Sequence, residues 1–196
     1  MTMAPIFPAE GLEVRQQGGR PTIHGRFPYK SLAVISDRGK VRKETIEPGA
    51  FKFALDDPDR DIHLLVGHDF GKPIASKATK SLTFQDGEEH LAFRAELAEG
   101  AERVSWVSDL LAMLAAGLIA GVSPGFRVPP SDVVPGAERL EPEKGNPGVF
   151  IRVLFALVLY ELSLVTRPAY EASQAELRAM NHNAHPLRTH GGIWLP

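Results

Sequence analysis

Short strand-like runs separated by turn residues constrain the fold of this chain more than any other feature of its sequence. Two of them, at residues 13–16 and 22–25, flank Gly18-Gly19 with the spacing of a β-hairpin. Residues 90–97 alternate apolar and polar side chains, as a strand with one buried face does. Further strands are expected around Ser123 and at residues 31–36, 62–66, 73–76, 81–85, 149–160 and 161–166.

Helical signals are few by comparison. Pro48 is placed to open a short helix, and residues 104–116 repeat apolar side chains at helical spacing before the capping residue Gly117. Residues 171–180 can form a last helix. Many short strands with two or three helices favour a mainly β fold with flanking helices, in the form of a closed or partly closed β-barrel.

The length of the chain fits one domain. With 196 residues, 43% of them hydrophobic, it can bury one core but is too short for two comfortable domains. We expect a single domain over residues 11–180, between a flexible arm at 1–10 and a flexible tail at 181–196. Residues 129–147 are rich in proline, glycine and charge, so a mobile loop is expected there.

Composition also narrows the class of function. The 22 basic and 24 acidic residues give a net charge of -2, which provides no electrostatic reason to expect nucleic acid or an anionic membrane as a partner. The absence of cysteine excludes disulfides, thiolate nucleophiles and zinc–thiolate sites. The N-terminal sequence does not resemble a secretory signal, and no apolar run is long enough to span a bilayer. A soluble protein of a cytoplasm-like compartment, without a cofactor, is therefore expected.

Ser123 is the first candidate for chemistry. Gly121 and Gly125 flank it at two residues on either side, so the backbone can turn and a substrate chain can approach. Pro124 disfavours a helical conformation for Ser123. Taken alone, the same stretch also fits a strand that ends in a turn without any catalytic role.

His68 and Glu161 are the other two candidates. His68 follows an apolar strand, and Glu161 interrupts an otherwise apolar segment. A buried carboxylate is costly unless it has a partner, although strand alternation would also allow Glu161 to face outward. With Ser123, these residues would supply a nucleophile, a base that takes its proton and a carboxylate that orients the imidazole, which is what acyl transfer requires. Ser123 and His68 are expected at solvent-accessible strand ends.

Four segments, in this order along the chain, resemble successive motifs of the tailed-phage prohead maturation proteases. They are IEPGAF at residues 46–51, LLVGHD at 64–69 with KPI at 72–74, GLIAGVSPGF at 117–126 and LYELSLVTRPAY at 159–170. No single segment is decisive, whereas the ordered set is specific. The resemblance implies a serine endopeptidase, related in fold to the herpesvirus capsid proteases, that cleaves scaffold and capsid precursor polypeptides inside the assembling procapsid of the host cytoplasm.

The same resemblance implies roles for individual residues. By the family's pattern, Ser123 forms the acyl-enzyme, His68 is the base and Glu161 is the third catalytic residue. Thr166, Arg167, Gly121 and Gly125 are expected near the oxyanion or the substrate. Two positions depart from the family's pattern, since Arg167 replaces a smaller polar residue and Ala75 replaces a glycine.

Two alternative functions stay open at the level of the sequence. The chain could be a non-catalytic capsid or scaffold-associated β-barrel module, or a metallohydrolase that uses His63, His68 and His90, although their spacing does not favour zinc. Asp69 is expected to be a turn residue rather than the catalytic carboxylate, because neighbouring side chains of an extended chain point apart. A homo-oligomer is also left open.

The chain is also expected to cut itself, most readily in the tail after Met180. The tail carries three histidines, two glycines and little to bury, so it can adopt the extended form that a protease cleft requires. A cut between 129 and 147 would instead separate Ser123 from Glu161.

Overall fold

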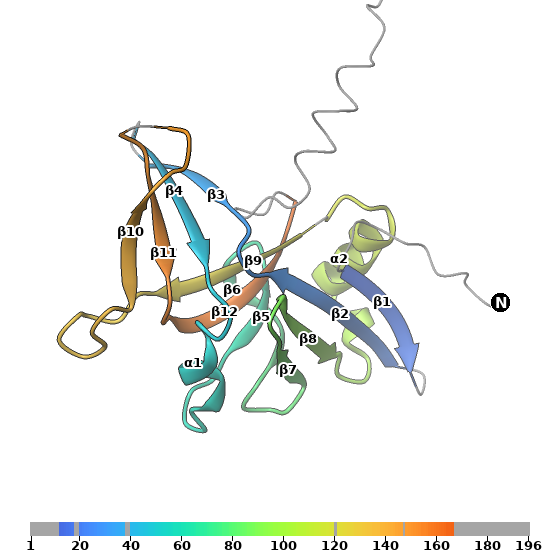
Figure 1. Cartoon of the computed structure of the whole chain (residues 1–196). Helices are drawn as coiled ribbons and strands as arrows, with labels where there is room; N and C mark the ends of the chain where they lie inside the picture. The colour runs from blue at the N-terminus through green and yellow to red at the C-terminus, as the bar shows by residue number, and fades with distance from the viewer. Residues whose placement is uncertain (1–11, 18–19, 38–39, 120, 147, 167–196) are drawn as a thin grey trace, which may run out of the picture.

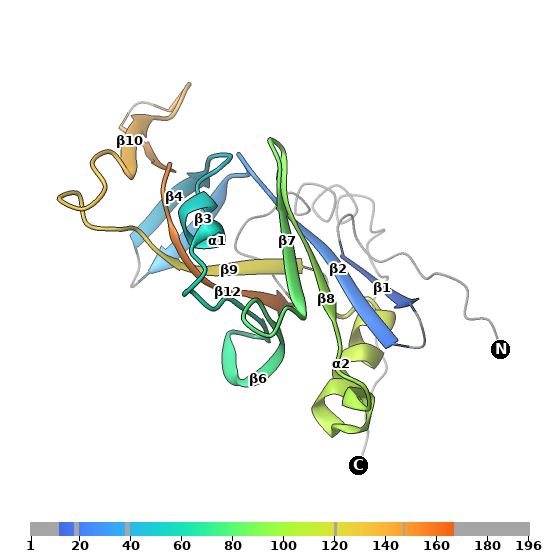
Figure 2. The same ribbon diagram turned by 90° about the horizontal axis from the view of Figure 1, so that it is seen from below.

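The computed structural model describes residues 12–17, 20–37, 40–119, 121–146 and 148–166. Within these residues the fold is mainly β, with three four-stranded sheets, two α-helices and one short 3-10 helix. In both ribbon views, strands β9 and β12 lie between the other two sheets (Figures 1 and 2). The prediction of a mainly β fold with few helices is confirmed.

The first sheet is antiparallel throughout, in the order β1-β2-β8-β7. Its strands are β1 (Leu12–Gln17), β2 (Arg20–Pro28), β7 (Leu82–Asp86) and β8 (His90–Glu96). The β1–β2 pairing confirms the predicted hairpin, and β8 buries every second residue as the alternation indicates. Residues 18–19, which connect the hairpin, lie outside the described residues.

The second sheet has the order β10-β11-β4-β3. Its strands are β3 (Ala33–Asp37), β4 (Lys40–Ile46), β10 (Glu138–Pro142) and β11 (Phe150–Leu154). Strand β10 lies inside the segment 129–147, where the sequence predicts only a mobile loop, and it pairs with β11 along its whole length. Strand β4 was not predicted, because its charged residues hide the alternation; it pairs with β3 antiparallel and with β11 parallel.

The third sheet has the order β6-β5-β12-β9 and carries the predicted catalytic residues. Its strands are β5 (His63–Val66), β6 (Asp69–Ser76), β9 (Gly121–Arg127) and β12 (Val158–Val165). The central pair, β5 and β12, is parallel, while β9 and β6 pair antiparallel with their neighbours. None of the three sheets closes on itself within the described residues, so the predicted closed or partly closed β-barrel is not confirmed.

The helices and aromatic residues join the sheets through one core. Helix α1 (Lys52–Asp56) follows Phe51, whose ring lies 5.9 Å from that of Phe27 on β2 and 6.4 Å from that of Phe126 on β9, measured between centroids. The 3-10 helix η1 (Ala101–Arg103) precedes helix α2 (Ser105–Ala115), which is as predicted and buries three side chains against this core: Val107, Leu110 and Leu114. The backbone φ of 69° at Gly117 ends α2 in the left-handed conformation that favours glycine. Phe51 therefore ties the first sheet to the strand that carries Ser123.

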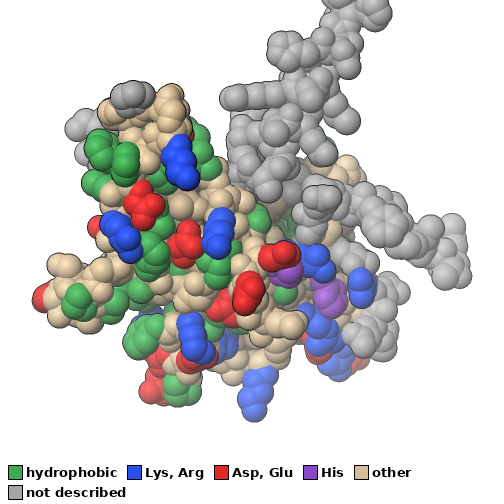
Figure 3. All heavy atoms as spheres, viewed as in Figure 1, with side chains coloured by type: hydrophobic (Ala, Val, Ile, Leu, Met, Phe, Trp, Pro, Cys, Tyr) green, Lys and Arg blue, Asp and Glu red, His purple; other side chains and the backbone are tan. Residues whose placement is uncertain are grey.

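Charges on the surface are mixed. In the view of Figure 3, acidic and basic side chains are interspersed, and apolar side chains lie among them over the second sheet. The apolar residues exposed on that sheet include Val34, Leu140 and Phe150. No helix of the described residues is long and apolar enough to cross a membrane. The arm at 1–10, the predicted helix at 171–180 and the tail at 181–196 lie outside the described residues.

Candidate active site

Strand β12 carries two buried polar side chains, Glu161 and Ser163, on one of its faces. Leu162 and Leu164 point into the core, so strand alternation directs Glu161 and Ser163 to the opposite face. Both are nevertheless buried, with exposures of 3% for Glu161 and 0% for Ser163. The outward, solvent-exposed alternative for Glu161 is therefore wrong, and its carboxylate needs partners within the protein.

His68 is brought to this face by a tight turn between β5 and β6. Val66 pairs with Asp69, and the two residues between them both have left-handed backbones, with φ of 61° at Gly67 and 62° at His68. Two consecutive positive φ angles are typical of the type I′ turn of a hairpin. Histidine adopts this conformation more readily than bulky or β-branched residues do. The turn explains the Gly-His dipeptide and fixes the place from which the imidazole leaves the backbone.

Hydrogen bonds join His68, Glu161 and Ser163 into one cluster. His68 Nδ1 lies 2.7 Å from Glu161 Oε1, and the Ser163 hydroxyl donates to Glu161 Oε2 at 2.6 Å. The backbone N–H of His68 donates to Ser163 Oγ at 2.9 Å. Because a carboxylate can only accept, the proton of a neutral imidazole sits on Nδ1, which leaves a lone pair on Nε2. Each oxygen of the buried carboxylate thus has one donor.

Ser123 lies beside this cluster on the neighbouring strand. It is paired with Ser163 in the register of β9 and β12, so the two side chains share a face with their Cβ atoms about 4.5–5.5 Å apart. Ser123 is 7% exposed and lies within β9 rather than at its end, which corrects the expected position at an open strand end. The His68 side chain is 48% exposed. Within the described part of the chain, no hydrogen bond joins Ser123 to His68, a separation that catalytic pairs without substrate often show.

Gly125 makes room for the side chain of Glu161. It lies opposite Glu161 in the strand register, and a Cβ atom on residue 125 would overlap the Glu161 side chain and its Oε1 atom. The space left by this glycine is therefore filled by the carboxylate. Glycine at 125 is what allows Glu161 to lie flat against β9 and reach His68.

The other predicted site residues lie around the same strands. Gly121 pairs with Val165 at the far end of the β9–β12 pair, and Thr166 follows as an exposed residue. Arg167, expected near the oxyanion, lies outside the described residues. Asp69 accepts a hydrogen bond from the Gly71 N–H at 2.8 Å, as expected of a turn residue.

The histidines considered for a metal site are not brought together. His63 faces Asp61 at 3.3 Å and the ring of Phe70, while His90 lies on β8 in the first sheet. Among the described residues, no group of three histidine, aspartate or glutamate side chains could hold a metal ion.

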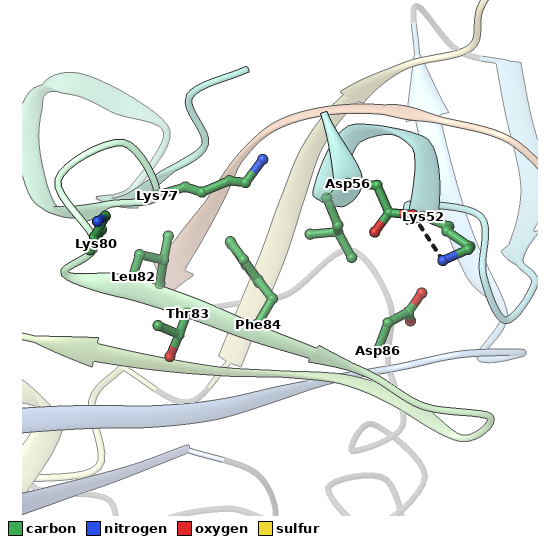
Figure 4. A pocket seen from close by; sticks show the side chains of 9 residues that line it. Lys52, Asp56, Lys77, Lys80, Leu82, Thr83, Phe84 and Asp86 are labelled. Carbon is green, nitrogen blue, oxygen red and sulfur yellow. Dashed lines mark hydrogen bonds and ion pairs between the residues drawn. The ribbon is translucent and has the colours of Figure 1, made fainter. Parts of the chain in front are cut away.

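A cavity of about 430 Å³ lies away from this cluster (Figure 4). It opens between α1 and β7, and its rim carries the Lys52–Asp56 ion pair, 2.8 Å from Nζ to Oδ2. None of its lining residues belongs to β5, β9 or β12. The cavity therefore forms no part of the candidate active site on the third sheet.

Ser163 is the residue that the sequence did not identify. The available signal was its spacing of two residues from Glu161, which puts both side chains on one face of a strand. Its bond to the backbone of His68, 95 positions away, depends on the parallel pairing of β5 with β12 and is not visible in any local pattern.

Comparison with known proteins supports the interpretation of these motifs. A family model described as caudovirus prohead serine protease matches residues 29–187, which include all of the third sheet. No curated protein and no solved structure matches the chain.

Proposed function

Because the chain belongs to the caudovirus prohead serine protease family, we propose that it hydrolyses peptide bonds with Ser123, His68 and Glu161 as its catalytic residues. The observation that carries this proposal is the 2.7 Å contact between His68 Nδ1 and Glu161 Oε1. Ser123 lies on the strand next to Glu161, on the same face of the sheet. A histidine held by a buried carboxylate and flanked by a serine is the arrangement that serine hydrolases use on unrelated folds.

In the proposed mechanism, Ser123 Oγ attacks the carbonyl carbon of the scissile peptide bond while its proton passes to His68 Nε2. Glu161 holds the imidazole by Nδ1 and stabilises the imidazolium that forms. The tetrahedral intermediate then collapses, His68 gives the proton to the leaving amine and an acyl-enzyme remains on Ser123. A water molecule gives a proton to His68 Nε2 and attacks the acyl carbon. The second tetrahedral intermediate collapses, His68 returns that proton to Ser123 Oγ, and the carboxylic acid product leaves.

The contacts of Ser163 argue against this residue as the nucleophile. Its hydroxyl proton is donated to Glu161 Oε2, its oxygen accepts the His68 N–H, and the residue is fully buried. A substrate carbonyl cannot reach it without breaking both bonds. Ser123 lies on the same face, and its hydroxyl makes no hydrogen bond with any residue that the structure describes.

Ser163 acts instead as a positioning residue. By holding a carboxylate oxygen and the backbone of His68, it fixes both ends of the Glu161–His68 pair at once. Such supporting hydrogen bonds keep a catalytic side chain within the narrow range of geometry that the reaction tolerates.

The proposed substrates are scaffold and capsid precursor polypeptides within the assembling procapsid, in the host cytoplasm. They follow from the family to which the chain belongs. Self-cleavage in the tail after Met180 is proposed from the composition of that tail, which carries little to bury and can adopt the extended form that a protease cleft requires. For self-cleavage, intact masses of the wild-type and Ser123→Ala proteins should differ by the loss of a C-terminal fragment. Identical masses that extend to Pro196 would contradict this part of the proposal.

The experiment that tests the proposed function is cleavage of the capsid precursor by purified variants. Ser123→Ala and His68→Ala should each abolish cleavage, whereas Ser108→Ala, at an exposed serine of α2, should cleave at the wild-type rate. Normal processing by the Ser123→Ala protein would show that the proposed mechanism is wrong.

A further inference from the structure

A β-bulge places Tyr160 on the same face as Glu161. Leu159 pairs with Phe126 and Glu161 pairs with Gly125, so Tyr160 is the extra residue of β12. Leu159 is fully buried in the core, and Tyr160 contacts Arg127, two residues beyond Gly125 on β9. Bulges commonly redirect a side chain next to an active site. Here the redirected side chain is a tyrosine adjacent in sequence to the proposed catalytic carboxylate.

Two arginines converge on the Tyr160 ring. Arg127 Nε–H donates to Tyr160 Oη at 2.6 Å, and its guanidinium carbon lies 5.2 Å from the ring centroid. The guanidinium carbon of Arg60 lies 5.9 Å from the same centroid. Arg60 has a carboxylate partner, since its Nε is 3.5 Å from Asp57 Oδ2. Arg127 has no ion pair with any residue that the structure describes, so the end of its guanidinium is available to an external anion.

Arg127 also lies in line with the proposed nucleophile. Ser123, Gly125 and Arg127 alternate along β9 and therefore share one face of the strand. At about 3.3 Å per residue, the Cα atoms of Ser123 and Arg127 are about 13 Å apart. An extended peptide bound along β9 covers that distance in about four residues.

We propose that Arg127, supported by Tyr160 and Arg60, binds an acidic side chain of the polypeptide substrate about four residues from the scissile bond. The planar guanidinium matches a carboxylate through two parallel hydrogen bonds, and the tyrosine restricts where it can point. The inference rests on the proposed function, because it takes Ser123 as the position of the scissile bond. It adds a preference for an acidic residue in the substrate sequence, which the catalytic residues alone do not provide.

The test uses internally quenched peptides that share one cleaved sequence of the capsid precursor. Each carries a single glutamate or glutamine at one of the positions from five residues before to five residues after the scissile bond. For the wild-type protein, kcat/KM should be roughly fivefold higher with glutamate than with glutamine at a position three to five residues from the bond, and similar elsewhere. This ratio should decrease as salt is added, because the pair is exposed.

Variants of the protein test whether Arg127 causes the preference for glutamate. Arg127→Gln should reduce the glutamate-to-glutamine ratio to about one, and Tyr160→Phe, which loses the Oη acceptor, should reduce it in part. The matched control is Arg139→Gln, since Arg139 also lies over an aromatic ring, at 4.8 Å from the centroid of Phe155, but on the second sheet. Its ratio should equal that of the wild type.

Two results would overturn the inference. One is a wild-type protein that cleaves these peptides with the same kcat/KM for glutamate and glutamine at every position. The other is an Arg127→Gln protein that keeps the wild-type ratio. In both cases the loss of cleavage in Ser123→Ala would still support the proposed protease mechanism, whereas cleavage that persists in Ser123→Ala would overturn that mechanism itself.

Discussion

Gly125 on β9 lies directly opposite Glu161 on β12, and the Glu161 carboxylate occupies the space that any side chain at residue 125 would need. The buried carboxylate and the glycine thus form one unit across two strands. A change at either position should reach His68 through the 2.7 Å contact with Glu161.

Gly125→Ala should reduce kcat/KM by about 100-fold or more, because the new methyl group displaces the carboxylate that orients His68. Gly87→Ala is the control, since it adds the same methyl group in the turn between β7 and β8 of the first sheet, 3.3 Å from the His90 carbonyl oxygen. Cleavage kinetics and thermal unfolding of both variants check this. A fully active Gly125→Ala protein would show that the position of Glu161 is not critical.

Ser163→Ala should lower kcat/KM by about 10- to 100-fold, because the His68 turn and one oxygen of Glu161 lose their shared partner. Loss of the hydroxyl also leaves the buried carboxylate with one donor fewer, so the free energy of unfolding should fall by about 1–3 kcal/mol. The distinguishing measurement is the far-downfield proton resonance of the His68 Nδ1–H, which should broaden or shift in Ser163→Ala. If the Ser163→Ala protein keeps the wild-type resonance and the wild-type kinetics, Ser163 is not a positioning residue.

Glu161→Gln should preserve the fold and reduce turnover by roughly 10²- to 10⁴-fold. The amide fills the same space but carries no charge to stabilise the imidazolium, and it can present its NH₂ group to His68 Nδ1. Single-turnover cleavage by the variant and the wild type provides the comparison. Equal cleavage rates for Glu161→Gln and the wild type would show that Glu161 has only a structural role.

Tyr29 provides a test of the core that does not involve catalysis. Burial, together with the 2.5 Å hydrogen bond from its hydroxyl to Asp86 Oδ1, raises the pKa of Tyr29 above its ordinary value of 10.0. The unfolded chain therefore loses this proton at a lower pH than the folded chain does. Stability from this group is complete below pH 10 and is lost as the pH rises above it.

Tyr29→Phe should accordingly flatten the alkaline part of the stability profile, measured as the urea midpoint between pH 8 and pH 11. Tyr160→Phe serves as the control, because Tyr160 is only partly buried on the surface of the third sheet. Parallel profiles for Tyr29→Phe and the wild type would contradict this account of Tyr29.

Hydrophobic periodicity and turn residues predicted the individual strands and helices whose formation depends on neighbouring residues. The hairpin of β1 and β2, the apolar strand β5 and helix α2 with Gly117 at its end all follow from periodicity and turn residues. Ser123 was identified by its flanking glycines, His68 by its place after an apolar strand and Glu161 by its apolar surroundings, and the resemblance of the four ordered motifs then implied their roles. The structure places these three residues on adjacent elements of one sheet.

The features that were missed depend on strand register between distant segments. The role of Gly125, the contacts of Ser163 and the bulge at Tyr160 all follow from how β12 pairs with β5 and β9. A one-residue shift in that pairing would turn every side chain to the other face, and no local pattern specifies it. Barrel closure was expected from the number of strands alone, which does not determine how sheets join.

The most direct test of the central claim is to locate the covalent adduct of a serine-reactive fluorophosphonate probe by mass spectrometry of the digested protein. The predicted result is a single adduct on the peptide that contains Ser123, absent from the Ser123→Ala and His68→Ala proteins and present in Ser108→Ala. An adduct on Ser163, or peptide cleavage by a protein in which Ser123 is never labelled, would contradict the assignment of Ser123 as the nucleophile.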